Sequence, residues 1–115
     1  MCERYSSKYL MASTRLEVLL SMVERNPADS FSRYGLAMEY VRSGDLATAL
    51  DHFMQLLTHN PNYAAAYFHG GQALEKLGRI EDARAMYELG VQVTSRTGDQ
   101  HTRSELQAAL DMLPL

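Results

Sequence analysis

Four histidines are the residues of this chain best suited to metal binding or proton transfer. They stand at positions 52, 59, 69 and 101. A zinc site on a helix usually presents two histidines four residues apart, because that spacing puts both rings on one face. No two of these histidines have that spacing. We therefore expect them at surfaces and helix ends, and we expect no metal site.

The acidic and glycine-rich segments also have structural explanations. Asp29 and Glu81-Asp82 come at expected helix starts, where carboxylates accept hydrogen bonds from free backbone amides. Gly70-Gly71 is not followed by the lysine and hydroxyl residue of a phosphate-binding loop. The sequence also lacks a nucleophile elbow. These patterns predict a non-enzymatic protein without a cofactor.

Length and composition limit the classes of function. The chain has 115 residues, 46% hydrophobic and 22% charged, which is typical of one globular domain. Eleven basic against fourteen acidic residues argue against a nucleic-acid partner. The single cysteine, Cys2, fits a reducing compartment, and no segment has the length of a secretory signal or membrane span. We expect a cytoplasmic protein with no membrane contact, and Met11 as a second candidate start residue.

Apolar residues recur at helical spacing through most of the chain. Thr14 and Glu17 form a capping-box pattern, so a helix is expected to begin at Thr14, after a flexible tail of residues 1–13. Prolines and glycines then divide the chain. The pattern predicts six helices and no strand, with the helices at residues 14–27, 30–43, 46–59, 64–77, 80–97 and 100–113.

Two stretches of this pattern repeat each other after 34 residues. Asn26-Pro27 recurs as Asn60-Pro61, and Gly44 recurs as Gly78. The same spacing joins the pairs Ala49 and Ala83, Phe53 and Tyr87. A period of this length in a helical pattern is typical of stacked helix-turn-helix units.

The repeated residues resemble the tetratricopeptide repeat. The first unit has Leu36-Ala37, Tyr40, Ala49, Phe53 and Pro61; the second has Tyr67, Gly71, Leu74, Ala83 and Tyr87. The resemblance implies an all-α, right-handed superhelical stack of antiparallel helix pairs. Within a domain at 14–115, it implies a half-repeat at 14–27, repeats at 30–63 and 64–97, and a capping helix at 100–113. The chain departs from the family at Arg33, where a large aromatic is usual, and at Gly70, where leucine is usual.

The resemblance also implies a binding surface, because the first helix of each unit lines a concave groove in this family. By phase, the expected lining residues are Phe31, Tyr34, Met38, Val41, Arg42, Phe68, Gln72, Glu75 and Lys76. Such a surface suits a peptide or a helix of a partner protein.

Three alternatives stay open at this stage. The apolar lining of the groove is either free for a ligand or covered by the protein itself, since neighbouring helices also use such stripes. The chain is either an adaptor or a unit that self-assembles into a homo-oligomer. Its small size and acidic charge also resemble those of secretion chaperones of this repeat family, which would make it a holdase.

Overall fold

The computed structural model describes the backbone of residues 7–115 and the side chains of residues 14–115, so Cys2 lies outside it. Within this range the chain forms six helices and no strand, as predicted. The helices are α1 (Ser7–Arg25), α2 (Ser30–Ser43), α3 (Leu46–His59), α4 (Ala64–Lys76), α5 (Ile80–Thr97) and α6 (Gln100–Asp111).

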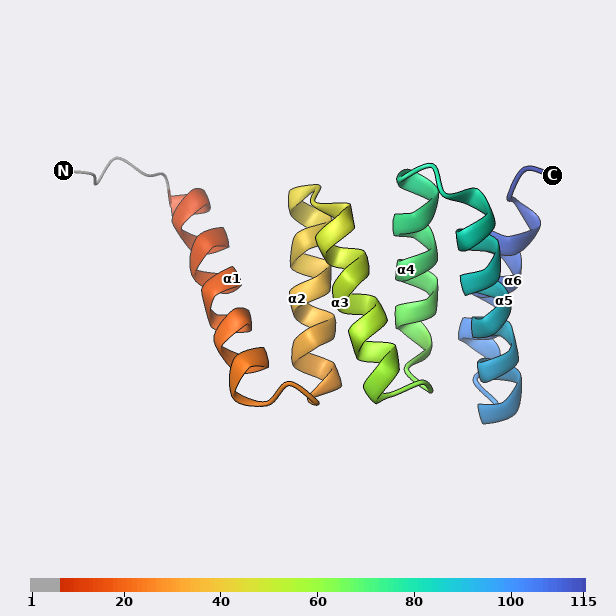
Figure 1. The fold of residues 1–115 in the computed structure, drawn as a ribbon, viewed down its shortest axis with the longest axis horizontal. Helices are drawn as coiled ribbons and strands as arrows, with labels where there is room; N and C mark the ends of the chain where they lie inside the picture. The colour runs from red at the N-terminus through yellow and green to blue at the C-terminus, as the bar shows by residue number, and fades with distance from the viewer. Residues whose placement is uncertain (1–6) are drawn as a thin grey trace.

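Each helix packs antiparallel against the next, so the helices form an elongated row and not a compact sphere. In Figure 1, α3 lies in front of α2, and α5 lies in front of α6. The molecule measures 53 × 30 × 21 Å. This shape is expected of stacked repeats, in which each unit contacts only its neighbours.

The first helix begins earlier than predicted. α1 starts at Ser7, so Thr14 lies inside the helix and does not cap it. The prediction of a helix start at Thr14 and of a tail extending to residue 13 was therefore wrong. Residues 7–13 contain no proline or glycine, and nothing in that segment opposes continued helical geometry.

The turns between helices repeat with the sequence. The amide of Asp29 donates to the carbonyl of Asn26, and the amide of Tyr63 donates to that of Asn60 in the same way. Gly44 and Gly78 end their helices with φ angles of 86° and 80°. Glycine takes this left-handed conformation without steric cost. The turn residues thus explain why the predicted bounds of the central helices agree with the structure to within one residue, whereas the first and last helices end two residues before the predicted 27 and 113.

Arg33 replaces the usual aromatic residue and makes an equivalent contact. Its Nη2 donates to the carbonyl oxygen of Pro27 at 3.1 Å, and 34 residues later the Tyr67 hydroxyl donates to the carbonyl oxygen of Pro61 at 2.7 Å. Arg33 is only 6% exposed. Its Nη1 also reaches Gln55 Oε1 at 3.0 Å and His52 Nδ1 at 3.1 Å, whereas its Nε has no hydrogen-bond partner among the described residues.

Small residues allow the helices to approach closely. A Cβ atom on Gly71 would lie 2.2 Å from the Tyr87 ring, and one on Gly90 would lie 2.8 Å from Cβ of Tyr67. Ala37 and Ala49 are fully buried in the core beside Phe53. Close approach at these points accompanies two adjoining clusters of buried apolar residues, one centred on Phe53 and one on Tyr87, with Leu57 packed against both.

Candidate functional site

The nine residues predicted to bind a partner all come from two helices, α2 and α4. We call the surface they form the α2–α4 face. It consists of Phe31, Tyr34, Met38, Val41 and Arg42 of α2, and Phe68, Gln72, Glu75 and Lys76 of α4. The structure gives these residues three different environments: exposed, half-buried in aromatic contacts, and engaged in bonds within the protein.

Phe31 is the most exposed aromatic side chain of this face. It is 74% exposed, at the first turn of α2. Tyr34 stands three residues later, a spacing that puts the two side chains on the same side of the helix. Unlike Phe31, Tyr34 is half-buried. A large apolar ring left in water beside a second ring is a candidate contact point for a partner.

Tyr34 belongs to an aromatic cluster that joins α2 to α4. Its ring centroid lies 5.3 Å from that of Tyr63, 5.9 Å from that of His69 and 6.3 Å from that of Phe53. Phe68 packs edge-on against His69 with centroids 5.3 Å apart. Separations of this size are favourable for aromatic pairs. The α2–α4 face is therefore partly filled by its own side chains.

Further along α2, Met38 and Val41 are partly buried and pack against the core. Arg42 is exposed, and its Nη2 lies 2.9 Å from Oε1 of Glu39. Glu39 is buried and also accepts from Arg15 of α1 at 3.3 Å. The hydrogen bond from Arg42, helped by Arg15, holds the pKa of Glu39 below its usual value. Arg42 thus has a structural role in addition to its predicted one.

On α4, the predicted residues divide in the same way. Glu75 accepts a hydrogen bond from the hydroxyl of buried Tyr87, and burial together with this carboxylate raises the pKa of Tyr87. Gln72 is partly buried and Lys76 is exposed. Lys76 is the one lysine or arginine of α4, and its exposure leaves it available to a partner.

Sequence analysis missed Tyr63 and His69 as members of this surface. Burial lowers the pKa of His69 and raises that of Tyr63. His69 stands three residues before Gln72 and seven before Lys76, spacings that put it on the same side of α4, so its position was a usable signal. Tyr63 stands before α4, and no helical phase could place it.

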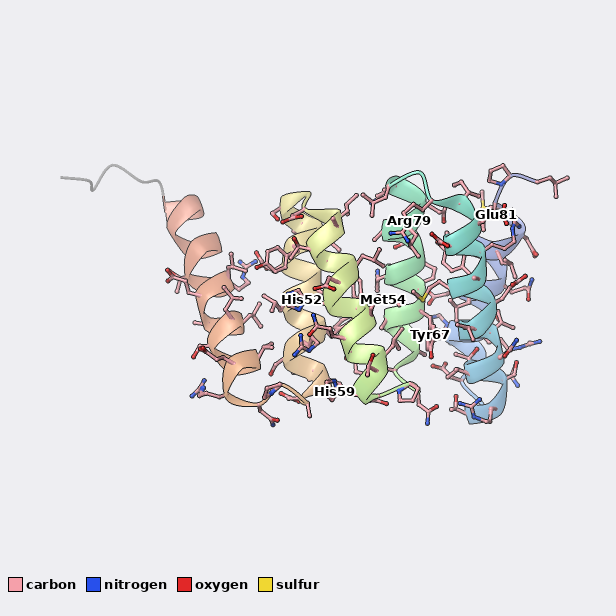
Figure 2. The ribbon with its side chains drawn as sticks, viewed as in Figure 1. His52, Met54, His59, Tyr67, Arg79 and Glu81 are labelled. Atoms are coloured by element: carbon pink, nitrogen blue, oxygen red, sulfur yellow. The ribbon has the colours of Figure 1, made fainter. Side chains whose placement is uncertain are left out.

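A second concave surface lies between α3 and α5, with α4 as its floor. We call this the α3–α5 cleft; it encloses about 630 Å³. Figure 2 labels three of its lining residues: Met54 of α3, Tyr67 of α4, and Arg79 before α5. His52, by contrast, lies on the side of α3 that faces α2, where its ring stacks on Tyr40.

Sequence analysis did not single out the α3–α5 cleft, although α3 carried a signal for it. Leu50, Met54 and Leu57 form a stripe at steps of four and three residues. This stripe is offset from the core residues Phe53 and Leu56. A helix with two apolar stripes has more apolar surface than one core needs.

Two general properties of the described residues bear on function. None of the helices is long and apolar enough to cross a bilayer, a statement that covers the part of the chain described here. In the same part, histidine, cysteine and carboxylate side chains do not gather in groups of three that could hold a metal ion.

Comparison with known sequences points to one repeat type. The family model described as tetratricopeptide repeat matches residues 34–94. A TPR repeat-containing protein of Pseudomonas aeruginosa is 26% identical over 98 residues, which are 85% of this chain and 93% of that protein.

Solved structures have the same arrangement of helices. A tetratricopeptide repeat domain protein from Salinibacter ruber is 38% identical, with a TM-score of 0.70 over 74% of this chain and 86% of that one. PcrH, solved in complex with the chaperone binding region of PopD, gives a TM-score of 0.79 over 96% of this chain and 95% of its own. Its identity is 13%, so this likeness concerns the fold alone.

Proposed function

Since this chain belongs to the tetratricopeptide repeat family, we propose that it is a non-enzymatic module that binds a peptide or helix of a partner protein on its α2–α4 face. One observation carries the proposal: Phe31 is 74% exposed beside the half-buried ring of Tyr34. Aromatic side chains contribute strongly to protein interfaces because they bury a large area with few rotatable bonds.

The α2–α4 face offers two kinds of contact to such a partner. Phe31 is free to be covered, while Tyr34 is held by Tyr63 and His69 and provides a fixed ring beside it. Exposed Lys76 adds positive charge at the end of α4, and Arg42, which is exposed and paired with Glu39, stands at the end of α2. The proposed ligand therefore combines an apolar anchor with an acidic group.

The fold comparison supports a polypeptide partner. PcrH, which has this fold, was solved in complex with the chaperone binding region of PopD. The proposed location is the cytoplasm, because the chain carries one cysteine. Recovery of a secreted protein as partner would favour the secretion-chaperone alternative.

The test begins with pull-down from native lysate by wild type and by Phe31→Glu, read by mass spectrometry. Phe31 is exposed, so its replacement leaves the core intact. Burial of one aromatic anchor contributes about 1.5–3 kcal/mol, which predicts roughly ten- to hundredfold weaker binding of the recovered partner by Phe31→Glu in calorimetry.

Met54→Glu is the matched control, because Met54 is also exposed but lines the α3–α5 cleft. It is expected to keep the partner of the α2–α4 face. Equal retention of every partner by wild type and Phe31→Glu would show that the α2–α4 face is not the binding surface.

A further inference from the structure

The shape of the α3–α5 cleft would accommodate one more helix. α3 and α5 each run antiparallel to α4, so they run in the same direction with a space of about 630 Å³ between them (Figure 1). Tyr67 and Leu74 of α4 form the floor of the cleft, and the buried side chains of Leu50 on α3 and Met86 on α5 adjoin it. The core below the cleft is therefore already closed, and the cleft is an outer surface.

The walls of the α3–α5 cleft present apolar side chains at helical spacing. On α3 these are Ala47, Leu50, Met54 and Leu57; on α5 they are Ala85, Met86 and Leu89. Met54 is 48% exposed and Leu89 is 51% exposed, one on each wall. Residues spaced by three and four positions on two parallel helices are what a third helix packs against.

Apart from the Tyr67 hydroxyl, which donates to the carbonyl oxygen of Pro61, the polar side chains that line the cleft come from α3 and the start of α5. They are Asp51, Thr58, Arg79 and Asp82. A small-molecule site usually has a few polar groups that converge on the ligand inside the pocket. The apolar floor and the polar walls therefore favour an amphipathic helix, with its apolar stripe inward, over a small polar ligand.

The charges around the cleft favour a basic helix. The guanidinium of Arg79 forms an ion pair with the carboxylate of Asp82, with 2.9 Å between Nη2 and Oδ2. Asp51 accepts from the amide of Gln55 and has no cationic partner among the side chains that the structure describes. Asp82 of α5 also lines the cleft, so its lining has two carboxylates, Asp51 and Asp82, against one cation, Arg79. Carboxylates thus stand on both walls, where lysine or arginine residues flanking an apolar stripe would meet them.

We propose that the α3–α5 cleft binds a basic amphipathic helix of a partner protein. The apolar stripe of that helix covers Met54 and Leu89, and its flanking cations approach Asp51 and Asp82. Met54 and Met86 have flexible thioether side chains, so the cleft adapts to the exact shape of the stripe. This surface is separate from the α2–α4 face, and the proposal does not depend on the function proposed for that face.

The test uses a synthetic peptide of about 18 residues, long enough to form a helix, with leucines at steps of three and four and lysines beside them. Full-length protein carrying ¹³C-labelled methionine methyl groups is titrated with it and followed by NMR. The methyl signals of Met54 and Met86 are expected to shift with increasing peptide until they reach a constant position. The signal of Met38, which lies on α2 and packs against the core there, is expected not to move. No saturable shift, or a shift of Met38 alone, would overturn the proposal.

Substitutions test whether the peptide binds in the cleft and whether its charge determines its affinity. Met54→Glu and Leu89→Glu are expected to weaken the lysine peptide at least tenfold, and Phe31→Glu, on the α2–α4 face, is expected to leave its affinity unchanged. Circular dichroism and thermal unfolding establish that each variant is folded. Asp51→Lys is expected to weaken the lysine peptide and to strengthen a version with glutamates in place of the lysines.

Other outcomes would contradict the proposed occupant. Equal binding of the lysine and glutamate peptides by wild type would remove the argument from charge. Shifts of Met54 and Met86 that depend on protein concentration in the absence of peptide would identify a second copy of this chain as the occupant.

Discussion

Gly70 and Gly71 are neighbours in α4 with very different surroundings. A Cβ atom on Gly70 would meet Met86 and Phe53 at 3.5 Å or more, which is ordinary contact, whereas one on Gly71 would meet the buried Tyr87 ring at 2.2 Å. Alanine in a helix interior is about 1 kcal/mol more favourable than glycine. We therefore predict that Gly70→Ala leaves the free energy of unfolding unchanged or raises it.

Gly71→Ala is expected to lower the free energy of unfolding by a net amount of about 1–3 kcal/mol, because displacement of Tyr87 outweighs the gain in helix propensity. Moving this ring also disturbs its hydrogen bond to Glu75. Urea unfolding of both variants measures the difference. Similar midpoints for the two would show that α4 and α5 move apart easily at this point.

Arg33 allows a test of what the repeat requires at its position. We predict that Arg33→Tyr is at least as stable as wild type, because tyrosine can donate to Pro27 as Tyr67 does to Pro61. The same change removes a buried cation whose Nε is unsatisfied within the described structure. Arg33→Leu is the matched comparison and lacks the donor, which costs about 1 kcal/mol.

Urea midpoints of the two Arg33 variants decide between two roles of the residue. If Arg33→Tyr were as destabilised as Arg33→Leu, the bonds of Arg33 to Gln55 and His52 would matter more than the bond to Pro27.

His52 predicts a dependence of stability on pH. Burial, and then the nearby Arg33 guanidinium, lower the pKa of His52 below 6.5, while Asp51 partly opposes them. The folded state therefore favours neutral His52, and the unfolded state takes up its proton first. Its contribution to stability is fully present above pH 6.5 and is lost as the pH falls below that value. Burial also lowers the pKa of His69, so its contribution to stability depends on pH in the same direction.

The measurement is the free energy of unfolding of wild type and His52→Gln between pH 8 and 5. The decline on acidification is expected to be smaller in His52→Gln, with the part due to His69 remaining. His101→Gln is the control, because His101 is exposed on α6. An unchanged decline in His52→Gln would show that the buried ring does not control this transition.

At the scale of helices, α1 is the least supported element. Its main contact is with α2, and Val18 and Leu20 are exposed on it. α4, in contrast, contacts α3, α5 and α6. We predict that backbone amides of α1 exchange with solvent fastest among the helices and those of α4 and α5 slowest, because stacked repeats open from their ends.

Hydrogen exchange followed by mass spectrometry measures this gradient. The comparison between α1 and α4 is internal, so it needs no variant. Protection of α1 equal to that of α4 would contradict the prediction and would indicate that another surface covers α1.

Local signals decided how much of these elements could be predicted. The bounds of α2, α3 and α5 followed from Asn-Pro pairs and glycines, which act through the backbone of their own segment. The start of α1 could not be predicted, since residues 7–13 contain no such signal. The aromatic contacts of Tyr34 with Tyr63 and His69 depend on how α2 and α4 meet, which no single segment encodes.

For the whole molecule, the open question from the sequence is whether the chain is an adaptor or a self-assembling unit. A stable dimer buries more than about 1,000 Å² of contiguous surface, much of it apolar. The large exposed apolar side chains here are dispersed over separate sites: Val18 and Leu20 on α1, Phe31 on α2, Met54 and Leu89 at the α3–α5 cleft, Leu77 after α4, and Met112 and Leu115 after α6. Dispersed side chains suit small contacts with separate partners better than one symmetric interface.

We therefore predict a monomer of 13.0 kDa by light scattering at protein concentrations from about 10 to 200 μM. Phe31→Glu and Met54→Glu are expected to have the same mass as wild type, because neither surface is covered by a second copy. A dimer that either substitution converted to a monomer would contradict the adaptor function and would identify the self-association surface. A dimer unaffected by both would assign that surface to α1, where Val18→Glu would then be the variant expected to separate the subunits.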